Sequence, residues 1–343
     1  MPSVTTDRKN PERPSEMQNE ITEKPLISIL MAVYEPRMDW LGEQLDSLNA
    51  QTYPHLRLYI RDDCSTTVSY EDIRHQVEDR ITAFPFTIER NEKNLGSNAV
   101  FESMIREAEG DYFAFCDQDD IWFPEKLETM HAAMEREGAV LACSDMVIID
   151  TGGKQIASSI TKVRKRHVFR SGEGLAPSLL VRNYVTGCAS LFRADIAKAA
   201  IPVCPDMVHD HYLAMCEARE GKIVSLPDRL IRYRIHGQSQ TRVMAGVTDK
   251  ESYYHIRIES MVRRLKWLQS RFSEDESLSE EIAQALCWAE ARSRNFRGDR
   301  TARKTVWKSR RFSPTASLFE VVMADKPEWL FMWCIRLIRK NLI

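Results

Sequence analysis

The sequence predicts an α/β protein in which helices flank a mixed, mainly parallel sheet, followed by a helical extension at the C-terminus. From Pro25 onward, short β-branched or aromatic runs alternate with stretches of helical periodicity, which is typical of βαβ units. Polar residues follow several of these runs, and from about Lys250 the pattern becomes helical and heavily charged. We therefore expect a leader at 1–24, an α/β domain at 25–245 and a helical, basic extension at 246–343.

The expected strands are apolar runs bounded by turn residues, and helices are expected after the first, third and fourth of them. In chain order the strands are 27–33, 56–63, 86–91, 111–117, 139–150, 185–192 and 230–236. After the first strand, Leu41, Leu45 and Leu48 share one face of a helix. Another helix is expected at about 99–109, and a further one begins near Pro124, because proline is tolerated in the first turn.

The composition is that of a globular protein with no overall preference for nucleic acid. The chain has 343 residues, of which 43% are hydrophobic and 29% charged, and its formal net charge is -2. Its eight cysteines are scattered and form no CxxC pair, which favours a reducing cytosol. Residues 1–24 lack the apolar segment of a signal peptide and have a disorder-prone composition. We expect a cytoplasmic protein, either soluble or peripheral on the cytoplasmic face of the inner membrane.

The segment FAFCDQDDIW, residues 113–122, places three carboxylates at the end of an apolar run. Asp117 and Asp119 are two residues apart, so both side chains point the same way on an extended segment. Oxygen ligands of this kind suit Mg²⁺ or Mn²⁺, which proteins hold through one or two carboxylates together with substrate phosphates. An acidic turn that caps the helix after Pro124 would explain the same residues.

Three more polar segments have both a functional and a purely structural explanation. Asp63 could accept hydrogen bonds from a nucleobase or ribose, or could simply make a strand-end turn. Gly96, in NLGSN, would let the backbone approach a ligand, and a helix start explains it equally well. In HDH at 209–211, Asp210 either stabilises a helix N-terminus or acts as a general base. The two histidines lack a third ligand at the spacing expected for zinc.

Two basic segments complete the candidates. Arg232, Arg234 and His236 alternate, so they would share one face of a strand, either solvated or clamping phosphate with His236 as a metal ligand. The tail, EWLFMWCIRLIRKNLI, mixes Trp and aliphatic residues with Arg and Lys at helical spacing. Such a helix lies on an anionic membrane surface, or it docks on the protein core or on a partner chain.

Seven of these motifs follow one another in a characteristic order. They are VYE, SLNAQTYPHLRLYIRDDCST, NEKNLGSN, EGDYFAFCDQDDIWFPEKL, VTGCASLFR, HDHYLAM and YRIHGQS. In this order and spacing they resemble the family 2 glycosyltransferases of the GT-A, Rossmann-like fold, and are most similar to bacterial rhamnosyltransferase-like members. The resemblance covers roughly residues 25–241 and implies an enzyme of polysaccharide biosynthesis.

The resemblance also implies roles for individual residues. The nucleotide sugar would contact Tyr34, Glu35, Asp63, Gly96, Asn98, Asp117, Gln118 and Asp145, and the acceptor would contact Gly187 and Trp122. In the acidic DXD-type motif, Asp119 would be the direct ligand of Mg²⁺ or Mn²⁺, with Asp117 and His236 as further contacts. Asp210 matches the position of the general base.

The implied activity is the inverting transfer of a hexose or deoxyhexose, with rhamnose suggested by the family likeness. The sugar would move from a UDP- or dTDP-linked donor to a hydroxyl group of a glycan or a lipid-linked acceptor. The alternatives are a nucleotidyltransferase acting on sugar phosphates and a non-catalytic nucleotide-sugar-binding module. A nucleotidyltransferase would be expected to carry a Gly-rich, basic phosphate loop near the first strand, which MAVYEPRMDW lacks. A homo-oligomer is compatible with each of these.

Overall fold

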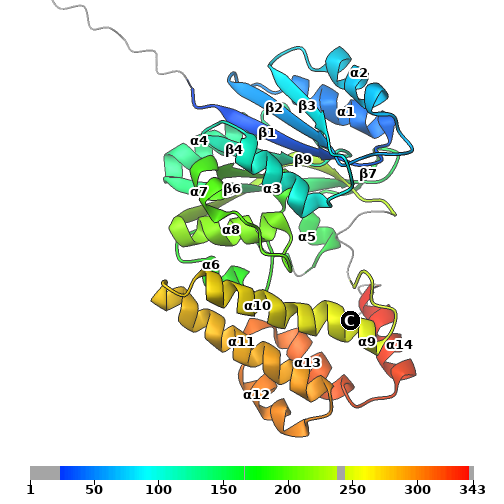
Figure 1. The fold of residues 1–343 in the computed structure, drawn as a ribbon, viewed down its shortest axis with the longest axis vertical. Helices are drawn as coiled ribbons and strands as arrows, with labels where there is room; N and C mark the ends of the chain where they lie inside the picture. Colours follow the sequence, from blue (N-terminus) through cyan, green and yellow to red (C-terminus); the bar gives the residue numbers. More distant parts are fainter. Residues whose placement is uncertain (1–23, 166, 238–243, 340–343) are drawn as a thin grey trace, which may run out of the picture.

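The computed structural model describes residues 24–165, 167–237 and 244–339, and its N-terminal part is built around one nine-stranded sheet (Figure 1). Residues 1–23 of the predicted leader lie outside the described part. The strands are β1 (Ile27–Val33), β2 (Leu56–Asp62), β3 (Phe86–Arg90), β4 (Tyr112–Cys116), β5 (Ile121–Trp122), β6 (Ala139–Ile149), β7 (Gln155–Ala157), β8 (Ser190–Arg193) and β9 (Lys222–Arg234). Their order is β3-β2-β1-β4-β8-β6-β9-β5, with β7 paired to β6.

The sheet is mixed, which confirms the predicted α/β class. Within the described chain, β1 pairs in parallel with β2 and β4, and β3 and β9 pair in parallel with β2 and β6. The short strand β8 runs antiparallel between β4 and β6, and β5 and β7 add antiparallel edges. Parallel pairing therefore dominates in the β1 half, where crossover helices join the strands.

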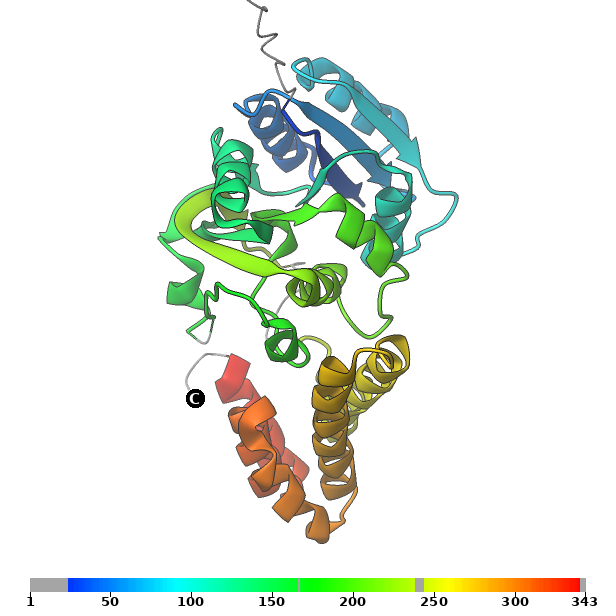
Figure 2. The same ribbon diagram turned by 90° about the vertical axis from the view of Figure 1, so that its left-hand side faces the viewer.

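Helices cover both faces of the sheet (Figure 2). They are α1 (Met38–Asn49), α2 (Tyr70–Arg80), α3 (Ser97–Glu107), α4 (Lys126–Glu137), α5 (Ile160–Val163), α6 (Ala176–Leu179), α7 (Ala194–Ala200) and α8 (His209–Glu220). Helices α1, α2 and α4 pack on the face to which Ile29 of β1 points. Helices α3, α7 and α8 pack on the face to which Leu30 points, because successive strand residues face opposite sides.

The C-terminal extension is a layer of helices that shares a hydrophobic core with the sheet (Figure 1). Its α-helices are α9 (Lys250–Tyr253), α10 (Ser260–Arg271), α11 (Glu276–Phe296), α12 (Arg303–Lys308), α13 (Pro314–Met323) and α14 (Glu328–Arg339). Leu268 of α10 and Trp288 of α11 belong to the same buried cluster as Phe113 of β4. The domain boundary near residue 245 stays a prediction. Residues from both sides of it contribute to this one buried cluster.

Polar contacts also join α10 to the segment that precedes α8. Arg264 donates through Nε and Nη2 to the carbonyl oxygen of Asp206, at 3.0 and 2.9 Å. Nη2 of Arg263 lies 2.7 Å from the Asp206 carboxylate. These bonds fix the backbone three residues ahead of His209, where α8 begins.

Residues 185–192 differ from the prediction of one continuous strand. They form a 3₁₀ turn (Gly187–Ala189) followed by the short strand β8. The backbone N–H of Gly187 donates to the carboxylate of Asp210 at 2.9 Å, so it is not available for a strand ladder. The predicted strand 230–236 is the last part of the longer β9.

A buried ion pair holds the helices of the extension together. Arg292 of α11 donates through Nε and Nη2 to the two carboxylate oxygens of Glu320 of α13, at 2.7 and 2.6 Å. Tyr253 of α9 donates its hydroxyl to the same carboxylate at 2.8 Å. Both charged side chains are almost fully enclosed, so each depends on the other to compensate its charge.

We predict that Glu320→Gln lowers the free energy of unfolding by about 3–5 kcal/mol, because it leaves Arg292 buried without its counter-charge. Urea unfolding followed by circular dichroism measures the change. The matched control is Arg294→Ala, on α11 like Arg292. The exposed ion pair of Arg294 with Asp299 is worth about 1 kcal/mol or less. Equal losses in the two variants would contradict this account.

Candidate functional site

The candidate site begins where the parallel strands β1, β2 and β4 end at one edge of the sheet. Tyr34, directly after β1, donates its backbone N–H to Oε1 of Gln118 at 2.8 Å, and its carbonyl accepts from Nε2 of Gln118 at 3.0 Å. The Gln118 amide thus ties the segment after β4 to the end of β1. The side chain of Tyr34 stays 47% exposed at this edge.

Asp63, directly after β2, fixes the loop that contains Gly96. Its carboxylate accepts from Nδ2 of Asn91 and from the backbone N–H groups of Leu95 and Gly96, each at 2.8 Å. Gly96 has a φ of 80°, a conformation that favours glycine, and it directly precedes α3. Asp63 therefore determines the shape of this loop.

Glu35 anchors the loop that follows Asp63. Its backbone has a φ of 44°, and its carboxylate accepts from the backbone N–H and hydroxyl groups of Thr66 and Thr67. These hydrogen bonds, that of the Thr67 hydroxyl above all, lower the pKa of Glu35 to about 2. The anchor is therefore negatively charged throughout the neutral pH range.

Asp119 and His236, 117 positions apart in the sequence, come together beyond β4. Oδ2 of Asp119 lies 2.6 Å from Nε2 of His236, and both side chains keep some exposure to solvent. An accessible carboxylate is the donor that Mg²⁺ and Mn²⁺ prefer, and the imidazole adds a nitrogen donor. The pair therefore fits a divalent ion that also contacts a bound phosphate.

Asp117 and Asp120 form an inner cluster with Cys188, in which the possible ligand atoms lie within 4.8 Å of one another. Burial, followed by the charge of Asp119, raises the pKa of Asp117 to about 7 and that of Asp120 well above its ordinary value. Asp120 is fully buried, and thiols are not ligands that Mg²⁺ or Mn²⁺ favours. The residues of this cluster thus fit such an ion less well than Asp119 does.

Arg234, the last residue of β9, holds the acidic segment in place. Its Nε donates to the carbonyl of Asp119 at 2.8 Å, and its backbone N–H donates to Oδ1 of Asp120 at 2.9 Å. Its Nη2 forms an ion pair with Glu43 of α1. Because Arg234 is buried and Arg232 is exposed, the two do not form the shared basic face that their alternation predicted.

Lys126 and Trp122 form a buried pair beside the acidic segment. Nζ of Lys126 donates to the carbonyl of Cys188 at 2.7 Å and lies 3.0 Å from the centre of the Trp122 ring. Burial lowers the pKa of Lys126 to about 7. Trp122 is 2% exposed, so the predicted contact with an acceptor does not fit this position. Lys126 was not among the predicted site residues, because lysines are almost always surface residues.

Asp210 lies in the first turn of α8, directly against Gly187. Oδ2 accepts from the N–H of Gly187 at 2.9 Å, and Oδ1 accepts from Nδ2 of Asn183 at 3.3 Å. A Cβ atom at position 187 would lie 3.0 Å from the Asp210 Cβ, so glycine permits this approach. Burial raises the pKa of Asp210 to about 6, against the opposing effects of both hydrogen bonds and of Arg164. Such a carboxylate is suited to accept a proton near neutral pH.

His209 and His211 flank Asp210 but point into the protein core. The ring of His209 stacks on Phe101 at a centroid distance of 4.0 Å, and Nε2 of His211 hydrogen-bonds to the carbonyl of Leu179. Burial lowers the pKa of each imidazole to about 3. In the part of the chain that the structure describes, neither histidine belongs to a group of metal-binding side chains, and zinc binding stays disfavoured.

Asn98 and Asp145, both predicted to contact the nucleotide sugar, bond to neighbouring protein groups. Nδ2 of Asn98 donates to the carbonyl of Met207 at 2.7 Å, and Oδ1 accepts from the N–H of His209 at 2.9 Å. Asn98 thus links α3 to the start of α8. Asp145 is buried in β6, and its Oδ2 lies 3.7 Å from Nε of Arg229.

The 3₁₀ turn at Gly187–Ala189 connects the acidic segment to α8. Gly187 bonds to Asp210, and the Cys188 Sγ lies within 4.8 Å of a carboxylate oxygen of Asp117. The charge of Asp210 contributes to the raised pKa of Asp117, so the two carboxylates lie within electrostatic reach. The structure therefore brings Asp117, Asp119, His236, Gly187 and Asp210 into one region, with Tyr34 and Gln118 on the side of β1.

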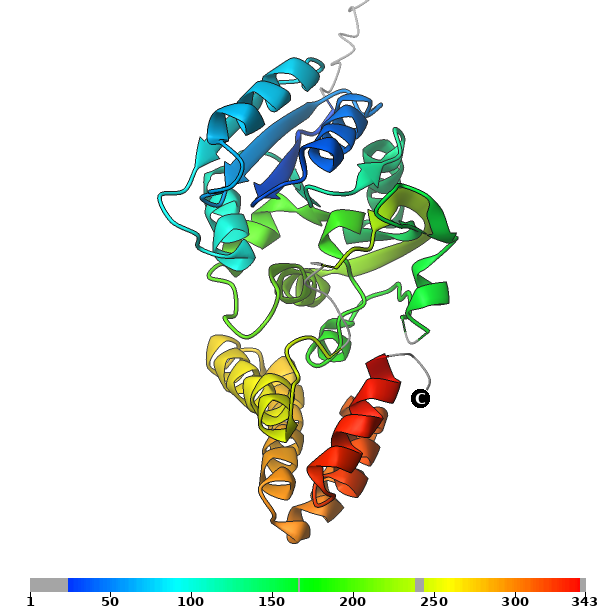
Figure 3. The same ribbon diagram turned by 90° about the vertical axis from the view of Figure 1, so that its right-hand side faces the viewer.

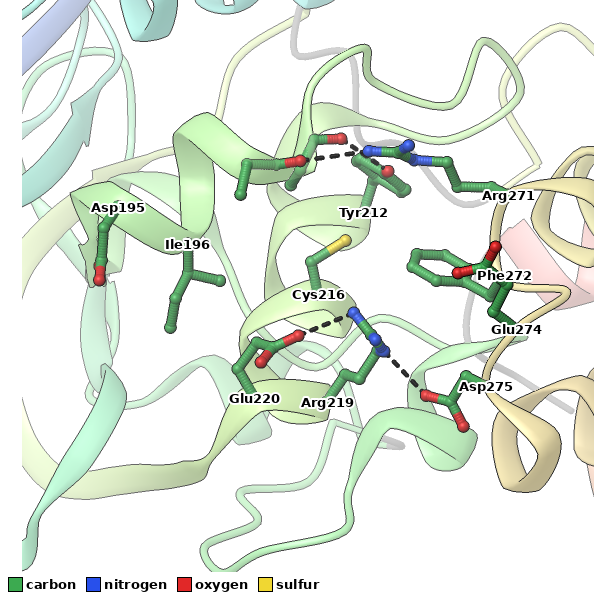
Figure 4. Close-up of a pocket in the computed structure, with 12 residues that line it drawn as sticks. Asp195, Ile196, Tyr212, Cys216, Arg219, Glu220, Arg271, Phe272, Glu274 and Asp275 are labelled. Carbon is green, nitrogen blue, oxygen red and sulfur yellow. Dashed lines mark hydrogen bonds and ion pairs between the residues drawn. The ribbon is translucent and has the colours of Figure 1, made fainter.

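A cavity of about 410 Å³ lies elsewhere, between α7, α8 and the turn that joins α10 to α11 (Figure 4). Arg219 on its wall pairs with both Glu220 and Asp275. Tyr212 and Cys216 of α8 also line it. No residue of the acidic region contributes to this wall, so the cavity is separate from the candidate site.

Comparison with known proteins gives consistent matches. The family model described as Glycosyl transferase family 2 matches residues 28–199. An uncharacterised glycosyltransferase of Nostoc is 26% identical over 236 residues, covering 66% of this chain and 69% of that protein. An uncharacterised glycosyltransferase of Methanocaldococcus jannaschii is 28% identical over 241 residues, covering 68% and 79%. The putative teichuronic acid biosynthesis glycosyltransferase TuaG of Bacillus subtilis is 28% identical over 171 residues, covering 49% and 62%.

A solved structure shares the fold. The crystal structure of S. aureus TarS 1-349 in complex with UDP-GlcNAc aligns with a TM-score of 0.54 and 16% sequence identity, covering 92% of this chain and 89% of that one. The likeness confirms the predicted GT-A architecture with a helical C-terminal region. The family match includes the acidic segment and Gly187, and it ends before Asp210 and His236.

Proposed function

Because the chain belongs to glycosyltransferase family 2, we propose that it transfers a hexose or deoxyhexose, with inversion, from a nucleoside diphosphate donor to a hydroxyl group of a glycan or a lipid-linked acceptor. The observation that carries the proposal is the 3₁₀ turn at Gly187–Ala189, whose Gly187 N–H bonds to Asp210 and whose Cys188 Sγ lies within 4.8 Å of a carboxylate oxygen of Asp117. This arrangement separates the groups that would bind the leaving diphosphate from the group that would accept the proton. Positioning both reactants in line is itself a large part of catalysis.

The nucleotide would lie at the ends of β1 and β2. Tyr34 offers an exposed ring on which a base can stack. The loops held by Asp63 and Glu35 would surround the base and ribose. TarS binds UDP-GlcNAc within the same fold, which makes UDP the first nucleotide to test, and the rhamnosyltransferase-like motifs make dTDP the second.

Asp119, with His236, would hold a divalent ion, Mg²⁺ or Mn²⁺. When bound, such an ion neutralises a diphosphate leaving group and acts as a Lewis acid. Arg234 supports this role from within the protein, because its guanidinium fixes the Asp119 carbonyl without competing for the Asp119 carboxylate. Asp117 would contact the ribose or the surroundings of the ion.

Asp210 would accept the proton of the acceptor hydroxyl as its oxygen attacks the anomeric carbon. The N–H of Gly187 and the amide of Asn183 orient the carboxylate. A pKa of about 6 leaves Asp210 largely ionised at neutral pH and makes it a stronger base than an ordinary carboxylate. Gly187 would then border the acceptor.

We also propose a cytoplasmic location, with attachment to the cytoplasmic face of the inner membrane. The basic, Trp-containing tail supports attachment, and all eight cysteines are free thiols, as in a reducing compartment. A homo-oligomer remains a prediction.

A first experiment tests nucleotide and metal binding. We expect UDP or dTDP to raise the melting temperature more with Mn²⁺ than without it, because both ligands would bind the native state. Asp119→Asn should remove the Mn²⁺-dependent part of the shift and keep the metal-independent part. The exposed Asp79→Asn on α2 should behave as wild type. The proposal fails if no nucleotide, GDP included, gives a metal-dependent shift.

A second experiment tests the general base. Asp210→Asn should lower turnover by about 100-fold or more, because general-base catalysis contributes on this scale. Release of the nucleoside diphosphate in the presence of glycan and lipid-linked acceptors measures turnover, and the thermal shift with nucleotide should not change. Asp79→Asn is again the control. Turnover at the wild-type rate in Asp210→Asn would sink the assignment.

The pH profile provides a third test. Asp210 must be ionised to accept a proton, so kcat/KM should fall as the pH decreases through about 6. Asn183→Ala removes a hydrogen bond that favours the charged carboxylate, so its acid limb should move to higher pH. Asp79→Asn should keep the wild-type profile. An acid limb that moves to lower pH in Asn183→Ala would contradict the assignment.

A further inference from the structure

Helix α14 has two opposite apolar faces, of which one is buried. Phe331 and Ile335, four residues apart, are fully enclosed in a cluster with Tyr253 of α9. Trp329 and Trp333, also four residues apart, are 72% and 54% exposed. At about 100° per residue, the two tryptophans lie on the side of the helix opposite the buried pair. Figure 3 shows α14, in red, in the helical part below the sheet, with one flank beside neighbouring helices.

The exposed face of α14 is basic as well as aromatic. Arg336 lies one turn beyond Trp333 on the same side and is exposed, and Lys326 is exposed just before the helix. Neither forms an ion pair within the described chain. We refer to Trp329, Trp333 and Arg336 as the tryptophan face.

The acidic residues nearby do not balance this charge. From Ala291 to Ile343 the sequence contains 13 Lys or Arg and 4 Asp or Glu, a difference of +9. Three of the four acidic residues, Asp299, Glu320 and Asp325, are already paired with arginines of the same segment. The fourth, Glu328, is exposed beside Trp329, and the segment that carries the tryptophan face still has a net positive charge.

We propose that the tryptophan face binds an anionic lipid surface. Tryptophan concentrates at the boundary between acyl chains and headgroups, where its ring is apolar and its N–H can hydrogen-bond. Arginine and lysine beside such rings are attracted to anionic headgroups. α14 would lie in the plane of the surface, as interfacial helices do. The described residues include no helix with the length and hydropathy needed to span a membrane.

A second copy of the chain is a poorer occupant of the same face. In a two-fold symmetric dimer the same patch faces itself, so Arg336 and the basic segment that carries it would meet their own positive charges. An anionic lipid surface complements that charge. The inference stands on α14 alone and does not depend on the proposed catalytic residues.

Point variants test the tryptophan face better than deletion of the tail. A deletion that includes α13 and α14 would remove Glu320, the counter-charge of buried Arg292, together with the buried Phe331 and Ile335. Such a protein would lose its fold for reasons unrelated to lipid. Trp329→Ser/Trp333→Ser changes exposed side chains only, and unchanged thermal unfolding would establish that the variant is folded.

The experiment is co-sedimentation of the full-length protein with vesicles of phosphatidylcholine, with or without about one-third phosphatidylglycerol. We expect binding to the anionic vesicles and a blue shift of tryptophan fluorescence. Trp329→Ser/Trp333→Ser should weaken binding by about tenfold or more, since two large apolar side chains no longer enter the interface. Arg336→Glu should also weaken it about tenfold, and only on anionic vesicles. The exposed Ile156→Ser, in β7, is the matched control and should bind as wild type.

Two results would overturn the proposal. One is equal binding of the wild type and the double tryptophan variant to anionic vesicles, or no binding of either. The other is a wild-type dimer in light scattering that Trp329→Ser/Trp333→Ser dissociates while vesicle binding is absent, which would assign the tryptophan face to self-association.

Discussion

Three carboxylates within four residues after β4 repel one another, and the site depends on how the surrounding chain separates them. Asp120 turns inward and accepts the backbone N–H of Arg234, while Asp119 turns toward His236. Asp117 is less buried than Asp120 and lies within 4.8 Å of the Cys188 thiol. The guanidinium of Arg234 bonds to the backbone between them, so it fixes their geometry and leaves the Asp119 charge available to a cation.

The turn at Gly187–Ala189 connects the acidic segment after β4 to helix α8. The Gly187 N–H donates to Asp210, the Cys188 carbonyl accepts from Lys126, and the Cys188 thiol lies within 4.8 Å of a carboxylate oxygen of Asp117. Two consecutive residues, Gly187 and Cys188, thus connect Asp210, Lys126 and the acidic segment. The absence of a Cβ at Gly187 is what allows α8 to approach so closely.

Much of the fold was predictable because apolar residues recur along the sequence with the periods of strands and helices. Candidate site residues were predicted where a charge follows an apolar run, as at Asp63 and Asp119, or begins a helix, as at Asp210. The sequence did not reveal which side chains are buried and bond to other groups of the protein. Lys126 is ordinary in sequence and buried in fact, and Trp122 is enclosed beneath it. Such differences arise from tertiary packing, which brings Cys188 to Lys126 across 62 positions.

The core shared by β4, α8, α10 and α11 makes the extension a structural part of the site. Arg264 bonds to the backbone just ahead of α8, the helix that carries Asp210. The extension therefore cannot swing as an independent body without opening the core that positions this carboxylate. A lipid surface that bound the extension would therefore also fix the orientation of the sheet relative to that surface. It would thereby fix the direction from which an acceptor reaches the site.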